Sequence, residues 1–476
     1  MNTDAYDAVV VGSGPNGLAA AVRLAQAGLS IIVLEAKETV GGGTRSAQLT
    51  LPGFVHDLCS AVHPLGLGSP FFRQLELEQY GLVWLQPEFP LAHPLGESRA
   101  AILKRSVQAT AEGLGEDRQG YEDLLEPLVS NWPELAGEFL QPMLHIPERP
   151  LALVPFVRRC FRSTTSLVDA WFTQEPARAL FAGLAAHSFL PLERIPSAAF
   201  GVVLGMLGHA VGWPSPQGGS QQIANALASL LRSLGGELRT GARIDDPAQL
   251  PKSRVVLWDL TPSQLLRIAG DQLPASYRHW LESFRYGPGI FKIDYALAEP
   301  IPWAAELCRR AGTVHVCGTF EEVAAAEREV TLGKHPERPF VLLAQPTLFD
   351  SARAPDGKHI VWAYCHVPRG SSVDMTTRIE AQIERFAPGF RDTILMRHTS
   401  NCAQLELSNA NLIGGSIDGG ATDLRQLIAR PIFSSAPYRM PRAGWYLCSA
   451  STPPGAGVHG MCGFHAAEAA LRDWFR

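Results

Sequence analysis

The residue spacing with the clearest chemical meaning lies near the start of the chain, in the run Gly12-Ser-Gly14-Pro15-Asn16-Gly17. Glycines at these intervals allow a tight turn, let the backbone approach a pyrophosphate, and let a helix pack closely against a sheet. Glu35 follows about 20 residues later, where a carboxylate can accept hydrogen bonds from ribose hydroxyls and repels a 2′-phosphate. The spacing therefore predicts a bound dinucleotide that has no 2′-phosphate.

Three elements are needed to position these residues. Residues 7–11 predict a strand, the Ala-rich residues after Gly17 predict a helix, and residues 31–34 predict a second strand that ends at Glu35. The phosphates would then lie on free N–H groups at the positive end of the helix dipole. Glycine-rich turns are common, so the glycine spacing alone is weak evidence. The order of strand, turn, helix and acid favours binding over a plain turn.

A second glycine cluster follows Glu35, in the run Gly41-Gly42-Gly43-Thr44-Arg45. This segment resembles the flavin amine oxidase and phytoene desaturase superfamily, in which the loop reaches the ribityl and phosphate region of FAD. The resemblance implies further cofactor contacts at Ala36 and throughout the loop. The superfamily usually has Arg directly after the Gly-Gly pair, whereas this chain has Gly43 there and Arg45 two positions later.

The C-terminal segment also resembles a flavin-binding motif. The run Pro454-Gly-Ala-Gly457-Val458-His459-Gly-Met461 is similar to the turn of phytoene desaturases that passes the isoalloxazine ring before a final helix. This implies cofactor contacts at Gly457, Val458 and Met461. A helix N-terminus there would stabilise the negative charge of reduced flavin. His459 is a candidate catalytic residue, although a histidine in a turn is at least as often a packing or solvent residue.

Two mid-chain segments extend the resemblance. Residues 213–220, a helix from 221 to 234 and a strand over 235–244 resemble the family's Pro-x-Gly-Gly helix and the strand after it, which lays backbone against adenine and includes Ile244. Residues 286–303 resemble the amine oxidase strand that presents a lysine, here Lys292, through a water to flavin N5. The alternative is that Lys292 is a surface lysine. Phe291 and Ile293 must face the opposite side of the strand.

Composition narrows the function classes. The 476 residues carry a net charge of −5 and no basic run with interleaved aromatics, which argues against nucleic acid as a partner. The eight cysteines form no Cys-x-x-Cys pair, so we expect reduced thiols and no metal site. Because no cleavable signal and no run of about 18 apolar residues is evident, we expect a cytoplasmic protein. Residues 150–162 mix apolar and basic side chains, which leaves peripheral membrane contact open beside an ordinary domain helix.

The order of these segments predicts an α/β fold with a discontinuous domain. A Rossmann-type FAD-binding domain is expected from residues 1–70, 213–270 and 430–476. Residues 71–212 and 271–429 are expected to form an α+β substrate domain with an antiparallel or mixed sheet and a helical part. Strands are predicted near residues 290–295, 340–344 and 359–364, and residues 71–212 read as mostly helical.

The resemblances cover most of the chain and identify it as similar to phytoene desaturase-like FAD oxidoreductases, near the group named after pyridine nucleotide-disulfide oxidoreductase domain-containing protein 2. They imply an FAD-dependent enzyme acting on a carbon–carbon bond of an apolar small molecule, such as an isoprenoid or carotenoid, by desaturation or flavin-assisted isomerisation. Only one dinucleotide fingerprint is present, so we expect oxygen or a quinone as the electron acceptor. Little acid–base machinery is evident, and hydride transfer in an apolar cavity requires little.

Two alternatives stay open. A flavin amine oxidase would need an aromatic pair flanking a substrate amine, and the sequence does not locate one. An FAD-bound protein that acts in binding or assembly without turnover would keep its flavin oxidised with every substrate. The sequence does not determine the oligomeric state.

Overall fold

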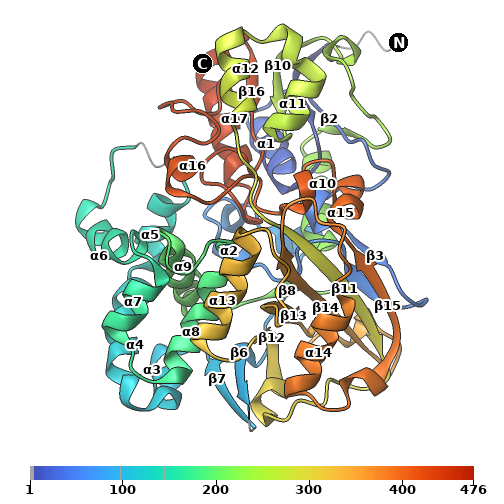
Figure 1. The fold of residues 1–476 in the computed structure, drawn as a ribbon. Coiled ribbons are helices and arrows are strands. Elements are labelled where there is room, and N and C mark those ends of the chain that lie inside the picture. Colours follow the sequence, from blue (N-terminus) through green and yellow to red (C-terminus); the bar gives the residue numbers. More distant parts are fainter. Residues whose placement is uncertain (1–4, 97, 143–144, 476) are drawn as a thin grey trace.

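A five-stranded parallel sheet brings the first and last parts of the chain together (Figure 1). The computed structural model describes residues 5–96, 98–142 and 145–475. The strand order is β16-β10-β1-β2-β9, with the bounds β1 (Tyr6–Val11), β2 (Ile31–Leu34), β9 (Glu237–Arg239), β10 (Ser253–Trp258) and β16 (Trp445–Leu447). Because β1 pairs with β10 on one side and with β2 on the other, the glycine-rich turn leaves from the middle of the sheet.

Helices cover both faces of the parallel sheet. Val10 and Val33 point to one face, Val9 and Ile32 point to the other, and all four are fully buried. Two covered faces explain why the central strands read as uninterrupted apolar runs. The first face packs against α1 (Pro15–Ala25), α10 (Gln221–Ser233) and α17 (Met461–Trp474), and the second against α11 (Pro262–Ala269) and α12 (Ala275–Glu282).

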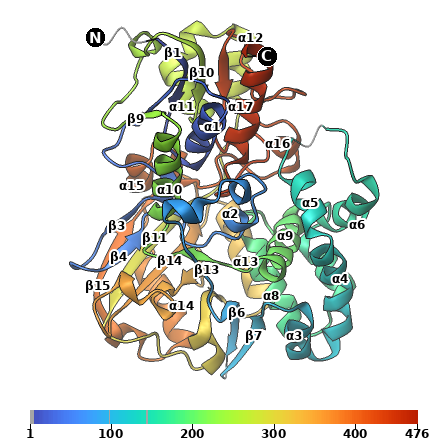
Figure 2. The same cartoon turned by 180° about the vertical axis from the view of Figure 1, so that it is seen from behind.

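The helices α1 and α17 lie side by side, although almost the whole chain separates them (Figure 2). Gly463 in α17 allows this approach, because a Cβ atom there would lie 1.8 Å from the backbone oxygen of Asn16. The close contact places the turn before α17 next to the turn before α1.

The second large sheet of the fold is mixed and has seven strands. Its order is β15-β11-β14-β13-β12-β6-β7, and only β12 and β6 among these neighbours pair in parallel. The bounds are β6 (Phe89–Gly96), β7 (Arg99–Leu103), β11 (Gly289–Leu297), β12 (Ala311–Val316), β13 (Val341–Ala344), β14 (His359–Val367) and β15 (Ile394–Ser400). The strands predicted near residues 290, 340 and 359 are β11, β13 and β14.

The two faces of the mixed sheet have different neighbours. Phe291 and Ile293 belong to an apolar cluster with α14 (Thr376–Phe386). Trp362 and Tyr364 point to the opposite face and join the core of the helical part. The face with Phe291 and Ile293 is therefore covered by α14. The face with Trp362 and Tyr364 lies toward the helical part and the parallel-sheet region.

A group of helices lies beside the mixed sheet in both views (Figures 1 and 2). Residues 71–212 are mostly helical, as predicted, but they also contribute β6 and β7, which the sequence did not reveal. Prolines at 90 and 94 obscure the strand pattern of β6, whose parallel partner β12 lies far along the chain. The helices are α3 (Val107–Ala111), α4 (Arg118–Ser130), α5 (Trp132–Phe139), α6 (Pro150–Cys160), α7 (Thr164–Trp171), α8 (Glu175–Ala186) and α9 (Ser197–Ala210).

Most of the remaining elements are short. The predicted strand over 235–244 is only the three-residue β9, and Ile244 lies beyond it. The fold also contains two small antiparallel strand pairs and four further α-helices, namely β3 (Ser46–Gln48) with β4 (Val55–Asp57), β5 (Trp84–Leu85) with β8 (Ser215–Pro216), α2 (Pro64–Gly68), α13 (Phe320–Thr331), α15 (Cys402–Ser408) and α16 (Leu424–Ile428).

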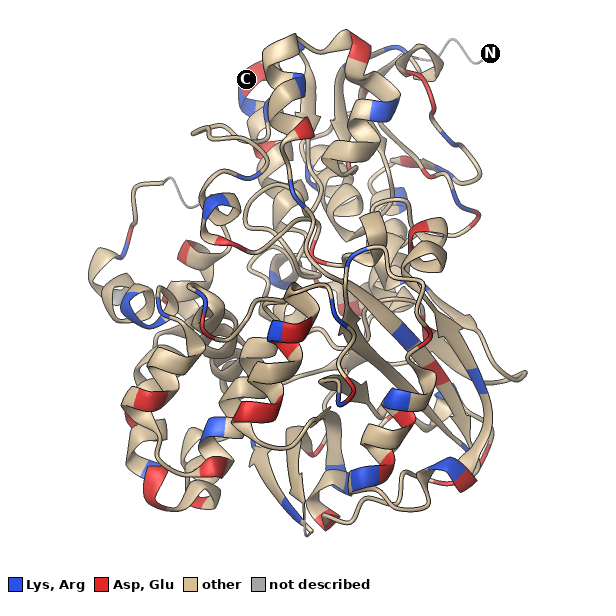
Figure 3. Cartoon of the chain, in the orientation of Figure 1, with Lys and Arg blue, Asp and Glu red and all other residues tan. Residues whose placement is uncertain are grey.

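Acidic and basic residues are interspersed over the helices and sheet edges (Figure 3). Among the residues that the structure describes, no helix combines the length and the apolar character needed to cross a bilayer. Within the same residues, no group of three or more His, Cys, Asp or Glu side chains is arranged to hold a metal ion.

Candidate active site

A cavity of about 460 Å³ opens at the carboxyl ends of the parallel strands and extends to the mixed sheet. Gly12, Glu35, Asp259 and Ser449 follow four neighbouring strands, β1, β2, β10 and β16, and all four residues line the cavity. The ends of parallel strands in such a sheet are where nucleotide ligands bind. The mixed sheet contributes residues such as Trp362 to the other end.

The turn between β1 and α1 forms a cradle without side chains. Gly12 has a φ of +102°, which favours glycine, and a Cβ atom on Gly14 would lie 2.6 Å from Asp259 Oδ2. Pro15 occupies the first turn of α1, and the buried Asn16 Oδ1 has no hydrogen-bond partner among the described residues. Gly17 does not line the cavity, but its Cβ would lie 2.2 Å from Gly12 O. Bare backbone at a helix N-terminus fits a pyrophosphate.

Glu35 is fixed at the end of β2. Its carboxylate accepts hydrogen bonds from the Ser13 backbone N–H at 2.9 Å, the Ser13 hydroxyl at 2.6 Å and the Lys37 backbone N–H at 2.9 Å. Ala36 and Ile244 line the cavity beside it. This is the end where the ribose and adenine of a dinucleotide would lie.

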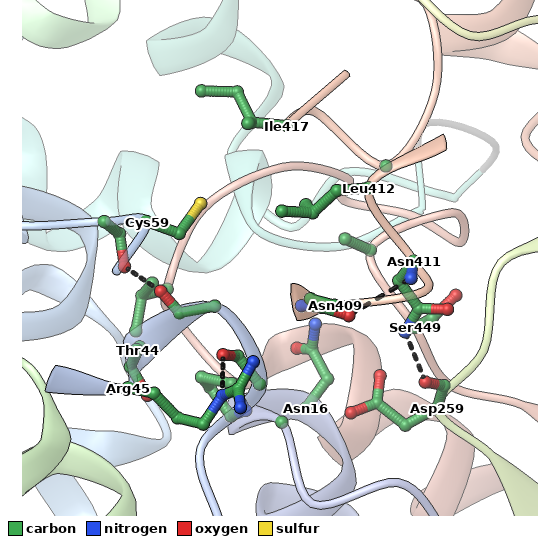
Figure 4. A pocket seen from close by; sticks show the side chains of 18 of the residues that line it. Asn16, Thr44, Arg45, Cys59, Asp259, Asn409, Asn411, Leu412, Ile417 and Ser449 are labelled. Carbon is green, nitrogen blue, oxygen red and sulfur yellow. Dashed lines mark hydrogen bonds between the residues drawn. The ribbon is translucent and has the colours of Figure 1, made fainter. Parts of the chain in front are cut away.

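The second glycine cluster packs onto the cradle. Gly42, Gly43, Thr44 and Arg45 line the cavity, whereas Gly41 does not. A Cβ atom on Gly42 would lie 3.1 Å from the Gly14 Cα, so the two glycine turns touch. The Arg45 guanidinium donates to the backbone oxygens of Gly42, at 3.1 Å, and Ser408, at 2.6 Å, at the polar end of the cavity (Figure 4).

The C-terminal turn reaches the cavity at residues 456–458. Gly457 and Val458 line the cavity, whereas Met461 and the fully buried His459 do not. His459 Nδ1 accepts a hydrogen bond from the Met461 backbone N–H at 3.0 Å, and burial lowers the pKa of His459 to about 4. His459 therefore holds the start of α17 as a neutral imidazole behind the cavity wall.

Lys292 is neither on the surface nor on the cavity wall. Its side chain is 1% exposed and pairs with Asp294, and its Nζ lies 5.9 Å from the centroid of the Trp362 ring. Trp362 lines the cavity, whereas Lys292 does not. The alternation predicted for β11 is present, because Phe291 and Ile293 face α14. The surface alternative for Lys292 is wrong, and its predicted flavin role stays a prediction.

The Lys292 pair belongs to a buried charge cluster. Arg353 contacts Asp57 at 2.8 Å, and His56 Nδ1 lies 3.7 Å from Asp294 Oδ1. Burial raises the pKa of Asp294 to about 6, although Lys292 lowers it in part. Burial, followed by Lys292 and Arg353, lowers the pKa of His56 to about 3. The cluster anchors the β3–β4 hairpin to the mixed sheet.

Asp259 is a site residue that the sequence reasoning missed. Its Oδ2 accepts a hydrogen bond from the Gly17 backbone N–H at 3.1 Å, at the position where α1 begins. Burial raises the pKa of Asp259 to about 8, and Glu35 contributes in the same direction. The carboxyl group is therefore neutral at pH 7 and compatible with a nearby phosphate. An acid directly after the strand over 253–258 was the available signal.

The end of the cavity away from the cradle is mostly apolar. Leu412 and Ile417 lie opposite the polar end that holds Asn16, Arg45 and Asp259 (Figure 4). The wall there is completed by Cys59, His187, Leu204, Trp213, Thr313, Leu342, Trp362, Tyr364 and Asp418. His187 hydrogen-bonds His315 between their Nε2 atoms at 3.0 Å. The cavity thus combines a phosphate-compatible end with an apolar one.

Comparisons with known proteins agree with this geometry. Residues 10–75 match the family model described as an NAD(P)-binding Rossmann-like domain. The chain is 26% identical to pyridine nucleotide-disulfide oxidoreductase domain-containing protein 2 of Rattus norvegicus, over 98% of this chain and 94% of the relative. It is 24% identical to phytoene dehydrogenase of Streptomyces griseus, over 86% of this chain and 80% of the relative. The solved structure of putrescine oxidase bound to putrescine aligns over 100% of both chains, with 16% identity and a TM-score of 0.64.

These similarities confirm the sequence resemblance, the Rossmann-like fold and FAD as the cofactor. In the structure, the glycine cradle, Glu35 and the Gly42–Arg45 loop would hold the adenine, ribose and phosphates, and the Gly457 turn would border the ring. Bound FAD supplies a two-electron hydride acceptor. The chain is thus an FAD-dependent oxidoreductase, similar in sequence to phytoene dehydrogenase and in fold to an amine oxidase.

Proposed function

We propose that the protein oxidises or isomerises a carbon–carbon bond of an apolar, isoprenoid-like small molecule bound between the FAD site and the mixed sheet. The observation that carries this proposal is the apolar end of the cavity, with Leu204, Leu342, Leu412 and Ile417 in its wall. Apolar side chains gain most when they cover an apolar ligand, which favours a hydrocarbon there.

The domain assignment follows the same division. All five strands of the parallel sheet fall in residues 1–70, 213–270 and 430–476, and all seven strands of the mixed sheet fall in 71–212 and 271–429. We assign cofactor binding to the first set and substrate binding to the second. The relative named phytoene dehydrogenase supports a hydrocarbon substrate for that second set.

The aromatic pair that β14 contributes to the cavity favours this reaction over amine oxidation. Trp362 and Tyr364 lie with ring centroids 5.2 Å apart and planes at 89°. The edge of one ring therefore meets the face of the other. An aromatic pair flanking an amine would need two rings that face the ligand from opposite sides.

Anaerobic flavin reduction tests the proposal. The FAD-loaded protein is mixed with phytoene in phosphatidylcholine liposomes, and the loss of oxidised-flavin absorbance is followed, with empty liposomes as the control. We expect phytoene to bleach the flavin, and oxygen or a quinone to restore its colour. Bleaching by putrescine with peroxide formation on reoxidation would instead support an amine oxidase. A flavin that no probe reduces would favour binding without turnover.

A further inference from the structure

One acidic residue stands in the wall at the apolar end of the cavity. Asp418 lines the cavity between Ile417 and Gly419, and its side chain has no ion-pair partner within 4.0 Å among the described residues. Asp418 is only 7% exposed, and its buried Oδ2 has no hydrogen-bond partner in that part of the chain. Buried carboxyl groups without a partner are costly, so such a group at a ligand cavity suggests a function.

The loop that carries Asp418 is held in one position by its backbone. The buried Arg430 donates from Nη2 to the Asp418 backbone oxygen at 2.5 Å and from Nε to the Ala450 oxygen at 3.1 Å. The Ser451 hydroxyl donates to the Gly419 oxygen at 2.7 Å. These contacts fix the loop to the segment just before the C-terminal turn. Arg430 therefore acts as a positioning residue for Asp418.

The neighbours of Asp418 leave its charge sensitive to pH near neutrality. Burial raises the pKa of Asp418 to about 7, while Arg430 and His366 lower it in part. Tyr364 and Cys59 also face the carboxyl group. Burial raises the pKa of Cys59 to about 11 and that of Tyr364 well above its usual value. These two groups stay neutral near pH 7, whereas Asp418 changes its charge there.

We propose that Asp418 is the catalytic base, which accepts a proton from the substrate carbon adjacent to the one that loses a hydride. This inference rests on the proposed carbon–carbon oxidation. Converting a single bond to a double bond breaks two C–H bonds, one as a hydride and one as a proton whose electron pair becomes the new π bond. Bound FAD would accept the hydride with its two electrons, and oxygen or a quinone would then take these electrons from the flavin. The proton forms an O–H bond with the Asp418 carboxylate.

The position suits this role for a physical reason. General bases work best when their pKa lies near the working pH, and the apolar wall keeps water away as a competing base. A base at Asp418 would add to the little acid–base machinery that is evident from the sequence. In the sequence, Asp418 stands in the glycine-rich run Gly414-Gly-Ser-Ile-Asp418-Gly-Gly, to which no chemistry could be assigned.

Two measurements on the FAD-loaded protein test the base, with Asp418→Asn as the variant and Asp423→Asn as the control. Asp423 lies nearby at the N-cap of α16, faces Arg285 and does not line the cavity, and Asn retains its cap. Infrared spectroscopy follows protonated carboxyl groups from pH 5 to 9, and the wild-type minus variant difference isolates the signal of one residue. Anaerobic stopped-flow absorbance follows flavin reduction by phytoene over the same pH range.

We expect the wild-type minus Asp418→Asn difference spectrum to contain a carboxyl band that titrates near pH 7. The Asp423→Asn protein should retain this band. Flavin reduction should accelerate with rising pH through the same midpoint in wild type and in the control. In Asp418→Asn, it should be slower by about 100-fold or more and independent of pH.

Two results would overturn the inference. In the first, Asp418→Asn loses no carboxyl band that titrates near neutral pH. In the second, the flavin of that variant is reduced at the wild-type rate and with the wild-type pH dependence. Failure of phytoene to reduce the wild-type flavin would contradict the proposed function instead. The infrared titration does not depend on a substrate, so the two failures are distinguishable. If Asp418→Asn does not bind FAD, measurements on the wild-type protein decide the question. The midpoint of its infrared titration and the midpoint of its pH profile for flavin reduction must then coincide.

Discussion

At the scale of single residues, Lys292 and Asp294 depend on each other. They are two residues apart on β11, and both are 1% exposed. Replacing Lys292 by Met removes the cation that lowers the pKa of Asp294. The buried Asp294 must then either keep a charge without its partner or become protonated, and because breaking a buried ion pair is costly, we expect a loss of about 3–5 kcal/mol of stability. FAD should stay bound, since Lys292 does not line the cavity. Differential scanning calorimetry of the FAD-loaded protein measures the loss.

The double variant Lys292→Met/Asp294→Leu provides the control for this pair. Removing both charges should recover much of the lost stability, because neither group is then buried alone. A single variant as stable as wild type would show that the pair contributes nothing. Slower flavin reduction in the double variant, at unchanged stability, would support the predicted flavin role of Lys292.

The raised pKa of Asp259 predicts how the affinity for FAD depends on pH. Its pKa is raised from the usual 3.8 to about 8, so the group is neutral below pH 8 and becomes charged above it. A carboxylate there repels the pyrophosphate, and we expect FAD affinity to fall as the pH rises from 7 to 9. Asp259→Asn should bind FAD with little change over this range. Fluorescence titration with FAD measures both proteins, and a parallel decline in the two would exclude Asp259 as the cause.

At the scale of elements, the packing of α17 on α1 tests how the chain ends are joined. Gly463→Ala places a Cβ 1.8 Å from the Asn16 backbone oxygen, so one helix must move, and we expect a loss of at least about 1–3 kcal/mol. Gly137→Ala in α5 is the control, because its Cβ would have no neighbour within 4 Å. Thermal unfolding should show a lower midpoint for Gly463→Ala alone. Equal midpoints would mean that the helices separate without cost.

The helix α6 lies in the segment for which the sequence leaves peripheral membrane contact open beside an ordinary domain helix. Leu151 is 87% exposed, Val154 and Val157 are also exposed, and Arg158 follows in the last turn. An apolar face beside basic residues favours the surface of an anionic bilayer. We expect wild-type protein to cosediment with phosphatidylglycerol-containing vesicles, and Leu151→Glu/Val154→Glu to lose this binding. Leu332 is an exposed leucine after α13, and Leu332→Glu is the control, which should still bind the vesicles. Loss of binding in both variants would mean that the added negative charge alone prevents it.

At the scale of the whole molecule, FAD should stabilise the fold as one unit, because distant segments line its cavity. Ligand at about 100 times its Kd contributes about 2.7 kcal/mol. We expect FAD to raise the unfolding midpoint of wild type and of Gly113→Val, whose Cβ would meet open space. Gly14→Val should be colourless and show no shift, because its side chain fills the phosphate cradle. A yellow Gly14→Val protein would contradict the assignment of this turn.

Local sequence patterns determined many of the predicted features of this protein. The turn around Gly14, the acid at Glu35 and the motif around Gly457 could be interpreted from the sequence because glycine and strand-end positions are fixed by short-range backbone geometry. The predicted strands near residues 290, 340 and 359 followed from alternation, a property of neighbouring residues. The placement of β6 beside β12 did not, because parallel pairing joins segments that are distant in sequence.

The sequence by itself determined that a dinucleotide is bound and predicted which loops line its cavity. Only the tertiary structure decided which ionisable groups lie in the cavity wall. Lys292 and His459 fit family patterns yet lie behind the cavity wall, whereas Asp259 and Asp418 matched no predicted role and line the cavity. Whether a side chain titrates near neutral pH depends on its burial and on charges from distant segments, and these exist only after the chain has folded.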